Sequence, residues 1–175
     1  MKILEFPGLK QTFSYDCGAT AIEAILDYYG FDVEEEKIIK LAGTNKKDGT
    51  SIKGVIKTLE NFKLKFHAGE LEIEKIKKQI DEGHPVILIL QAWTNKKKID
   101  WEKDWKDGHY VVAIGYDKNK LYFEDPSSPL RTYLSYDELN KRWHNQQKKE
   151  KYFHYAISVY GKKPKFSLNK KVHMG

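Results

Sequence analysis

The feature that most constrains the fold is an uninterrupted aliphatic run, Val86–Leu90, in the middle of the chain. A run of this length without polar residues is typical of a strand buried at the centre of a sheet. Before it, apolar residues recur at helical spacing, most clearly at Ile52, Val55, Ile56 and Leu59. After it, the pattern mostly indicates strands joined by short polar turns. Helices followed by antiparallel strands predict an α+β fold, with N-terminal helices packed on a C-terminal antiparallel sheet.

Glycine, serine and polar turns divide the chain into its expected elements. We expect helices over residues 18–29, 34–41, 51–61, 73–80 and 136–143. We expect strands over residues 64–67, 86–90, 109–116, 121–124, 131–134 and 152–160. No repeat or linker interrupts this series. The chain is therefore expected to form one domain over residues 1–160, followed by a basic, flexible tail over residues 161–175.

The net charge of +6 is concentrated near the C-terminus. Residues 161–175 hold five lysines and no acidic residue, so residues 1–160 carry only the remaining +1. Nearly all basic residues are lysines, whereas nucleic-acid surfaces usually rely on arginine for bidentate contacts. We therefore expect no nucleic-acid partner.

The sequence shows no sign of a membrane or secretory segment. No apolar run approaches the ~20 residues that span a bilayer. Met1–Leu9 has neither the basic start nor the apolar stretch of a secretory signal. The single cysteine cannot form an internal disulfide, which agrees with a reducing compartment. We therefore expect a cytoplasmic protein without a membrane span.

The single cysteine, Cys17, stands where the first helix is expected to begin. There a thiol meets unpaired backbone N–H groups and the positive end of the helix dipole, and both favour the nucleophilic thiolate. Far downstream, His109 begins an apolar strand and Asp125 follows the next strand. A thiol, an imidazole and a carboxylate placed in this way are the components of a thiol acyl-transfer site.

Several other polar residues could be catalytic or structural. Asp107 and Asp117 are closer to His109 in sequence but flank loops, and Asp16 is a candidate cap of the first helix. No ligand spacing of the zinc kind and no Gly-rich phosphate loop is present, so neither a metal nor a cofactor is expected. Four histidines are expected to be structural: His67, His84, His144 and His154.

A long polar loop, residues 94–108, precedes His109 and is rich in lysine and tryptophan. Loops of this length are often lids or substrate walls. Its tryptophans and the one before it (Trp93, Trp101 and Trp105) are equally consistent with lining a substrate cleft and with anchoring the loop to the body.

Three motifs carry a resemblance to a known family. They are Gln11 with Asp16-Cys17-Gly18, the run Gly108-His109-Tyr110-Val111-Val112, and Glu124-Asp125-Pro126. Together they resemble the papain-like cysteine peptidases of family thirty-nine, whose best-known members process bacteriocin leader peptides. The resemblance covers roughly residues 6–160.

The resemblance implies a role for each matching residue. Cys17 would be the nucleophile, His109 the general base and acid, and Asp125 the residue that orients the imidazole. Gln11, six positions before Cys17, would donate its amide N–H to the oxyanion together with the backbone N–H of Cys17. The resemblance implies a peptide or protein substrate and no cofactor or metal.

The chain lacks the membrane and ATPase regions of the fused family members, so a stand-alone, soluble form is expected and double-glycine specificity is not carried over. Two alternatives stay open at this point. The same site could transfer the acyl group to an amine instead of water. The domain could also bind peptides without turning them over. The sequence leaves the oligomeric state undetermined.

Overall fold

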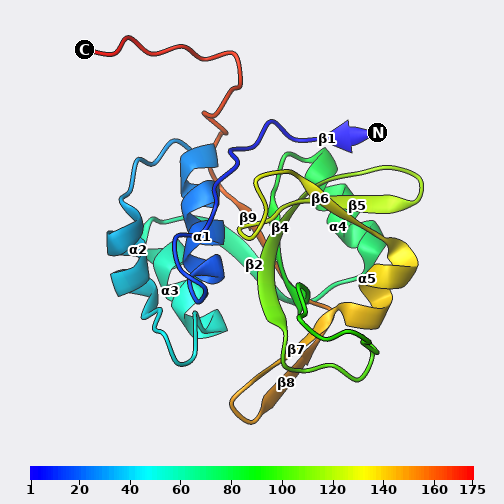
Figure 1. The fold of residues 1–175 in the computed structure, drawn as a ribbon. Helices are drawn as coiled ribbons and strands as arrows, with labels where there is room; N and C mark the ends of the chain where they lie inside the picture. The colour runs from blue at the N-terminus through cyan, green and yellow to red at the C-terminus, as the bar shows by residue number, and fades with distance from the viewer.

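The computed structural model describes residues 1–175 and has a single antiparallel sheet at its centre (Figure 1). Along the sheet the strands follow the order β2-β9-β3-β4-β5-β6, and β1 also pairs with β4. The strands of this sheet are β1 (Lys2–Ile3), β2 (Lys65–Glu70), β3 (Val86–Gln91), β4 (Gly108–Tyr116), β5 (Lys120–Glu124), β6 (Thr132–Ser135) and β9 (Tyr155–Tyr160). A separate two-stranded hairpin consists of β7 (His144–Gln147) and β8 (Glu150–Phe153).

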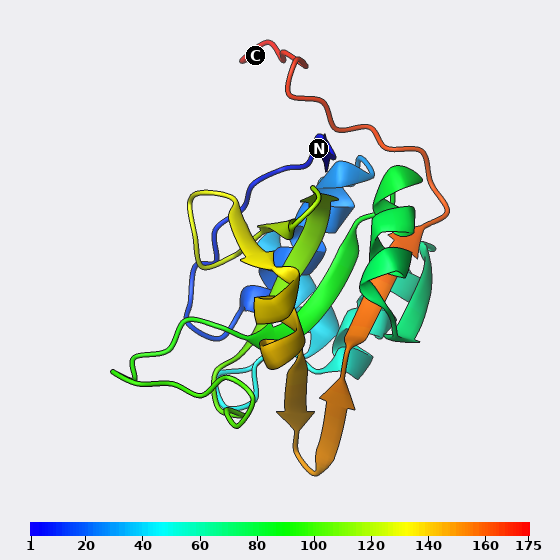
Figure 2. The ribbon, with the colours of Figure 1, turned by 90° about the vertical axis from the view of Figure 1, so that its right-hand side faces the viewer.

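Helices lie on both faces of the sheet, as Figures 1 and 2 show. The helices are α1 (Cys17–Tyr28), α2 (Glu35–Ala42), α3 (Ile52–Asn61), α4 (Ile73–Asp81) and α5 (Tyr136–Arg142). Helices α1, α2 and α3 form a group on one side, and α4 and α5 lie on the other. Every residue of β3 is buried, as the aliphatic run predicted. The expected α+β fold is confirmed.

Local sequence signals set several helix boundaries. The Ser51 side chain caps α3 by accepting a hydrogen bond from the Gly54 N–H at 3.0 Å. Gly43 ends α2 in the left-handed conformation, with φ of 66°. Ser135 and Glu138 form a reciprocal capping box at the start of α5. The five expected helices therefore begin and end within one or two residues of their predicted bounds.

One expected strand is wrong. Residues 152–160 form parts of two strands, because His154 separates β8 from β9. Its φ of 49° is incompatible with a continuous strand. β8 pairs with β7, whereas β9 pairs with β2 and β3. The alternating pattern continues across His154 and gives no sign of this break. The sequence predicts neither β1, which has only two residues, nor β7, which is short and polar.

The last residues, 161–175, form no helix or strand. The backbone N–H groups of Lys165 and Phe166 both donate to the Tyr28 carbonyl, at 3.0 and 3.2 Å. The division into a domain and a flexible tail stays a prediction. None of the five helices has the length and apolar character required to cross a membrane.

Candidate active site

Cys17 is the first residue of α1 and is partly exposed. Gly18 lets this helix end approach its neighbours closely, since a Cβ at Gly18 would lie 2.6 Å from the Thr50 Cβ and 3.0 Å from the Tyr110 ring. Because Tyr110 follows His109 on β4, this close packing brings the start of α1 next to the histidine strand.

The expected cap of α1 takes a different form. Asp16 is fully buried at the N-cap position, but its carboxylate makes no hydrogen bond to the helix. It accepts instead from the backbone N–H groups of Thr12 and Phe13, at 3.3 and 3.1 Å. The expectation that Asp16 caps α1 is therefore wrong. Its carboxylate stabilises the turn before the helix, and no side chain caps the N–H groups beside Cys17.

His109 and Asp125 are joined by a short hydrogen bond, with 2.6 Å between His109 Nε2 and Asp125 Oδ1. Both residues are buried. The pairing of β4 with β5 brings them together, because Asp125 directly follows the last residue of β5 and His109 is near the start of β4. Since Nε2 is bonded to Asp125, Nδ1 is the ring nitrogen left for Cys17.

Electrostatics favour the charged forms of this pair. Burial lowers the pKa of His109, but interactions with the side chains of Asp125 and Cys17 outweigh it and raise that pKa from 6.5 to about 9. Burial raises the pKa of Asp125, but hydrogen bonds from His109, Ser127 and Trp93 keep it below its usual value. At neutral pH the pair is therefore an imidazolium and a carboxylate.

Three further residues contact the Asp125 carboxylate, two through side chains and one through its backbone N–H, and the sequence does not predict these contacts. The Trp93 indole N–H donates to Oδ2 at 2.9 Å, the Ser127 backbone N–H donates to Oδ1 at 2.9 Å, and the Thr132 hydroxyl lies 3.4 Å from Oδ2. The Asp-Pro-Ser turn could have indicated the Ser127 contact. Trp93 depends on the register of β3 against β4, which no local signal encodes.

Gln11 lies against the loop that carries Asp125. Its backbone N–H donates to the Pro126 carbonyl at 2.8 Å, and its side-chain oxygen accepts from the Ser127 hydroxyl at 3.0 Å. The side-chain nitrogen donates to the Phe13 carbonyl at 2.5 Å and retains a second N–H. Ser127 thus fixes which end of the carboxamide acts as the donor.

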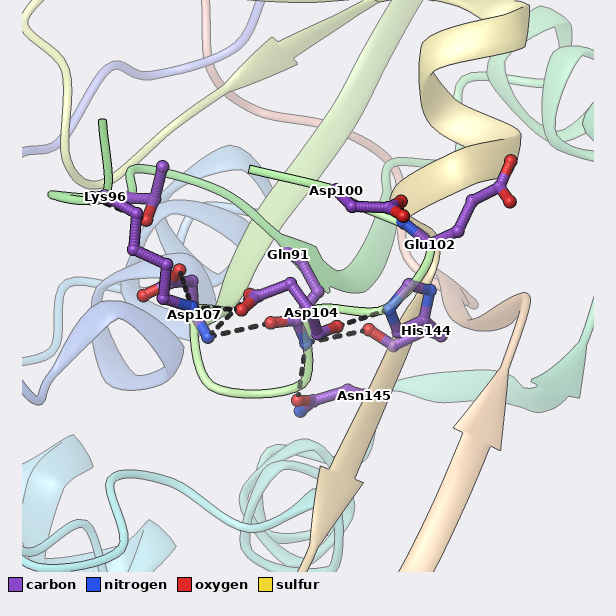
Figure 3. A network of polar contacts seen from close by, with 9 residues as sticks. Gln91, Lys96, Asp100, Glu102, Asp104, Asp107, His144 and Asn145 are labelled. Carbon is purple, nitrogen blue, oxygen red and sulfur yellow. Dashed lines mark hydrogen bonds and ion pairs between the residues drawn. The ribbon is translucent and has the colours of Figure 1, made fainter. Parts of the chain in front are cut away.

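Buried polar contacts hold the long loop that precedes His109 (Figure 3). Gln91, at the end of β3, accepts from the Asp107 N–H at 2.8 Å and donates to the His144 carbonyl and to Asn145. Lys96 forms ion pairs with Asp104 and Asp107. These contacts connect the loop to the end of β3 and to β7.

The tryptophans of this region divide between the two expected roles. Trp101 stacks under the Arg142 guanidinium, with 4.0 Å from the guanidinium carbon to the ring centroid, and so anchors the loop. Trp105 lines the cleft and also contacts His144, with 4.5 Å between ring centroids. The His144 Nε2–H donates to the Asp104 carbonyl at 2.6 Å, in line with its expected structural role.

Cys17 and His109 line the same cleft, which has a volume of about 890 Å³ and is called the Cys17 cleft below. It lies between the helical side of the molecule and the β7–β8 hairpin. No group of three or more His, Cys, Asp or Glu side chains is arranged to hold a metal ion.

A cysteine helix that packs against the sheet, opposite a histidine on a central strand, is the architecture of papain-like cysteine peptidases. A double-glycine-motif protease from an AMS/PCAT transporter, solved with its leader peptide, shares this fold with a TM-score of 0.66 at 19% identity, over 91% of this chain and 95% of that one. The peptidase domain of Streptococcus ComA, a bifunctional ABC transporter, shares it with a TM-score of 0.64 at 20% identity, over 87% and 96%.

The family assignment rests on sequence. The profile of the peptidase C39 family matches residues 5–147, and the chain belongs to this family of cysteine peptidases. The pediocin PA-1 transport/processing ATP-binding protein PedD of Pediococcus acidilactici is 28% identical over 129 residues, or 73% of this chain. This chain covers 16% of the length of that protein.

Proposed function

We propose that Cys17, His109 and Asp125 form a catalytic triad that hydrolyses peptide amide bonds through a thioester. The observation that carries the proposal is the 2.6 Å hydrogen bond that His109 Nε2–H donates to Asp125 Oδ1, with His109 in the cleft that Cys17 also lines. An imidazolium next to a thiol at a helix N-terminus favours the thiolate. The solved relative bound to its leader peptide supports a peptide substrate.

In the first half of the reaction, the Cys17 thiolate attacks the scissile carbonyl carbon, and the carbonyl oxygen becomes an oxyanion. The backbone N–H of Cys17 and the second N–H of Gln11 stabilise this oxyanion. The His109 imidazolium then protonates the leaving amine as the carbon–nitrogen bond breaks. The products of this half are a free amine, a neutral His109 and a thioester on Cys17.

In the second half, neutral His109 takes a proton from water, which attacks the thioester. The carbon–sulfur bond breaks, the carboxylic acid product leaves and the thiolate–imidazolium pair is restored. Asp125 accepts the Nε2–H bond throughout and keeps Nδ1 directed at the reacting atoms. An amine in place of water at this stage would make the enzyme a transferase.

The proposal is tested by the pH dependence of iodoacetamide labelling of Cys17, the single cysteine. Wild-type protein is expected to label rapidly below pH 7. His109→Ala is expected to label slowly until the pH approaches ~8.5, as an ordinary thiol does. His84→Ala, which changes a histidine outside the Cys17 cleft, serves as the matched control and should behave as wild type. Slow labelling of all three proteins would instead favour a peptide-binding module without turnover.

Hydrolysis and acyl transfer are separated by analysis of the products. A peptide substrate found by screening is incubated with the enzyme, with and without an added amine such as glycinamide. Hydrolysis yields a free carboxylate in both reactions, whereas a transferase yields the amide adduct. The cytoplasmic location expected from the sequence stays a prediction beside this proposal.

A further inference from the structure

Two turns that each carry a pair of lysines flank the Cys17 cleft. Lys46 and Lys47 lie in the loop between α2 and α3, and Lys148 and Lys149 form the turn between β7 and β8. Both segments lie at the lower end of the molecule in Figures 1 and 2. One pair therefore comes from the helical side of the cleft and the other from the hairpin side.

The charge of this cleft is strongly positive and locally uncompensated. Six lysines and two acidic residues line it, which gives a local charge of +4. All six lysines are exposed, and none of them takes part in an ion pair. These lysines are Lys46, Lys47, Lys53, Lys106, Lys148 and Lys149. Residues 1–160 as a whole carry a net charge of only +1, so the +4 of the cleft lining exceeds the net charge of the domain that contains it.

Hydrogen bonds between residues that line the Cys17 cleft connect the two lysine-bearing segments. The Gln147 side-chain oxygen accepts from the Ile52 backbone N–H at 3.1 Å, so the hairpin is joined to the start of α3. The Gln147 side-chain nitrogen donates to the Tyr110 hydroxyl at 3.0 Å, and that hydroxyl donates to the Thr50 carbonyl at 2.7 Å. The lysines thus extend from an ordered base, which reduces the entropy lost when a ligand binds.

We propose that the Cys17 cleft selects peptides with an acidic segment next to the scissile bond. This inference rests on the proposed peptidase function and adds the class of substrate. Both arginines of the chain, Arg131 and Arg142, line a different pocket, so the cleft lacks the bidentate guanidinium groups that nucleic-acid sites favour. The Trp105 ring contacts His144 and Phe153, and the Lys151 ammonium lies over it at 4.9 Å from the ring centroid.

The test measures peptide binding by fluorescence anisotropy with the full chain carrying Cys17→Ala, which prevents turnover. The probes are fluorescein-labelled decapeptides in which glycine alternates with glutamate, glutamine or lysine. The glutamate peptide is expected to bind at least about tenfold more tightly than the glutamine peptide at 50 mM salt, and this gap should shrink at 500 mM salt. The lysine peptide should bind most weakly.

Two double variants locate the effect. Lys46→Gln with Lys47→Gln, and Lys148→Gln with Lys149→Gln, should each weaken binding of the glutamate peptide about threefold or more and leave the glutamine peptide unchanged. Lys162→Gln with Lys163→Gln removes the same charge outside the cleft and should have no effect. Circular dichroism verifies that each variant is folded.

The outcomes separate this inference from the proposed function. Equal binding of the glutamate and glutamine peptides, or equal losses in the control variant, would overturn the acidic-segment proposal even if Cys17 labels rapidly. Binding of a ten-nucleotide single-stranded DNA as tightly as the glutamate peptide would also overturn it, since the cleft would then bind any polyanion. Preference for the glutamate peptide together with an unreactive Cys17 would support the charge selection and reject the peptidase mechanism.

Discussion

Replacement of Asp125 by asparagine should remove the charge that keeps His109 protonated above neutral pH. In the folded protein burial opposes the imidazolium, yet interactions with Asp125 and Cys17 raise the pKa of His109 from 6.5 to about 9. This difference corresponds to about 3 kcal/mol of preference for the imidazolium, at ~1.36 kcal/mol per pKa unit. Because the folded state holds the proton more tightly than the unfolded state, this contribution to stability is complete below pH 6.5 and is lost as pH rises through 9.

The contribution of His109 to the free energy of unfolding of the wild type should therefore fall by roughly 3 kcal/mol between pH 6.5 and pH 9.5. In Asp125→Asn the side-chain oxygen can still accept from Nε2–H, but it carries no charge, so burial is opposed less strongly and the pKa of His109 falls. The stability of this variant should fall less than that of the wild type over the same pH range.

Urea unfolding at a series of pH values measures both curves, and NMR titration of the His109 ring measures the pKa directly. The ring signal is assigned by its absence from His109→Ala. Asp137→Asn, an exposed change in the first turn of α5, is the matched control and should retain the wild-type slope. A parallel fall in Asp125→Asn and wild type, or a wild-type His109 that titrates near 6.5, would refute the reasoning.

Three further predictions follow from the same region. Gln11→Ala should lower kcat for a peptide substrate by ~10²-fold or more, because one oxyanion donor is lost. Glu35→Gln should flatten the pH dependence of the melting temperature: a carboxyl contact with Asp16 and burial raise the pKa of Glu35 to about 7, so wild-type stability falls as pH rises from 4.5 to 7. Gly18→Ala should destabilise the fold by about 1–3 kcal/mol in urea unfolding, because its Cβ would lie 2.6 Å from the Thr50 Cβ.

Each of these predictions has an outcome that contradicts it. An unchanged kcat in Gln11→Ala would remove Gln11 from the oxyanion site. Glu36→Gln alters the exposed neighbour on α2 and is the control for Glu35→Gln, and equal effects of both changes would show that the Asp16 contact is unimportant. Gly18→Ala at wild-type stability would mean that α1 can move away from Thr50 without cost.

Much of the fold could be predicted because its signals are local. The aliphatic run of β3, the caps of α3 and α5 and the Asp117–Lys120 turn are all encoded within a few residues. Short polar strands such as β7 carry no such signal, since their pairing depends on residues elsewhere in the chain. His154 shows the opposite error, in which a regular pattern continues across a break in the backbone.

The candidate site divides in the same way. Sequence order and element type predicted that Cys17 lies at a helix start, that His109 lies near the start of a strand and that Asp125 directly follows the next strand. The contacts of Trp93 with Asp125 and of Ser127 with Gln11 could not, because they depend on strand register and on the course of two loops. Gln147, which connects the hairpin to Tyr110 in the Cys17 cleft, lies on β7, a strand that the sequence does not predict.

The indole of Trp93 gives this site an intrinsic optical reporter. Its N–H is bonded to the Asp125 carboxylate while 58% of the residue remains exposed, so the emission wavelength and intensity should respond to events on that carboxylate. Trp143, in contrast, is almost completely enclosed and should give a constant background. Occupancy of the site could then be followed in unlabelled protein, in real time and without a chromogenic substrate.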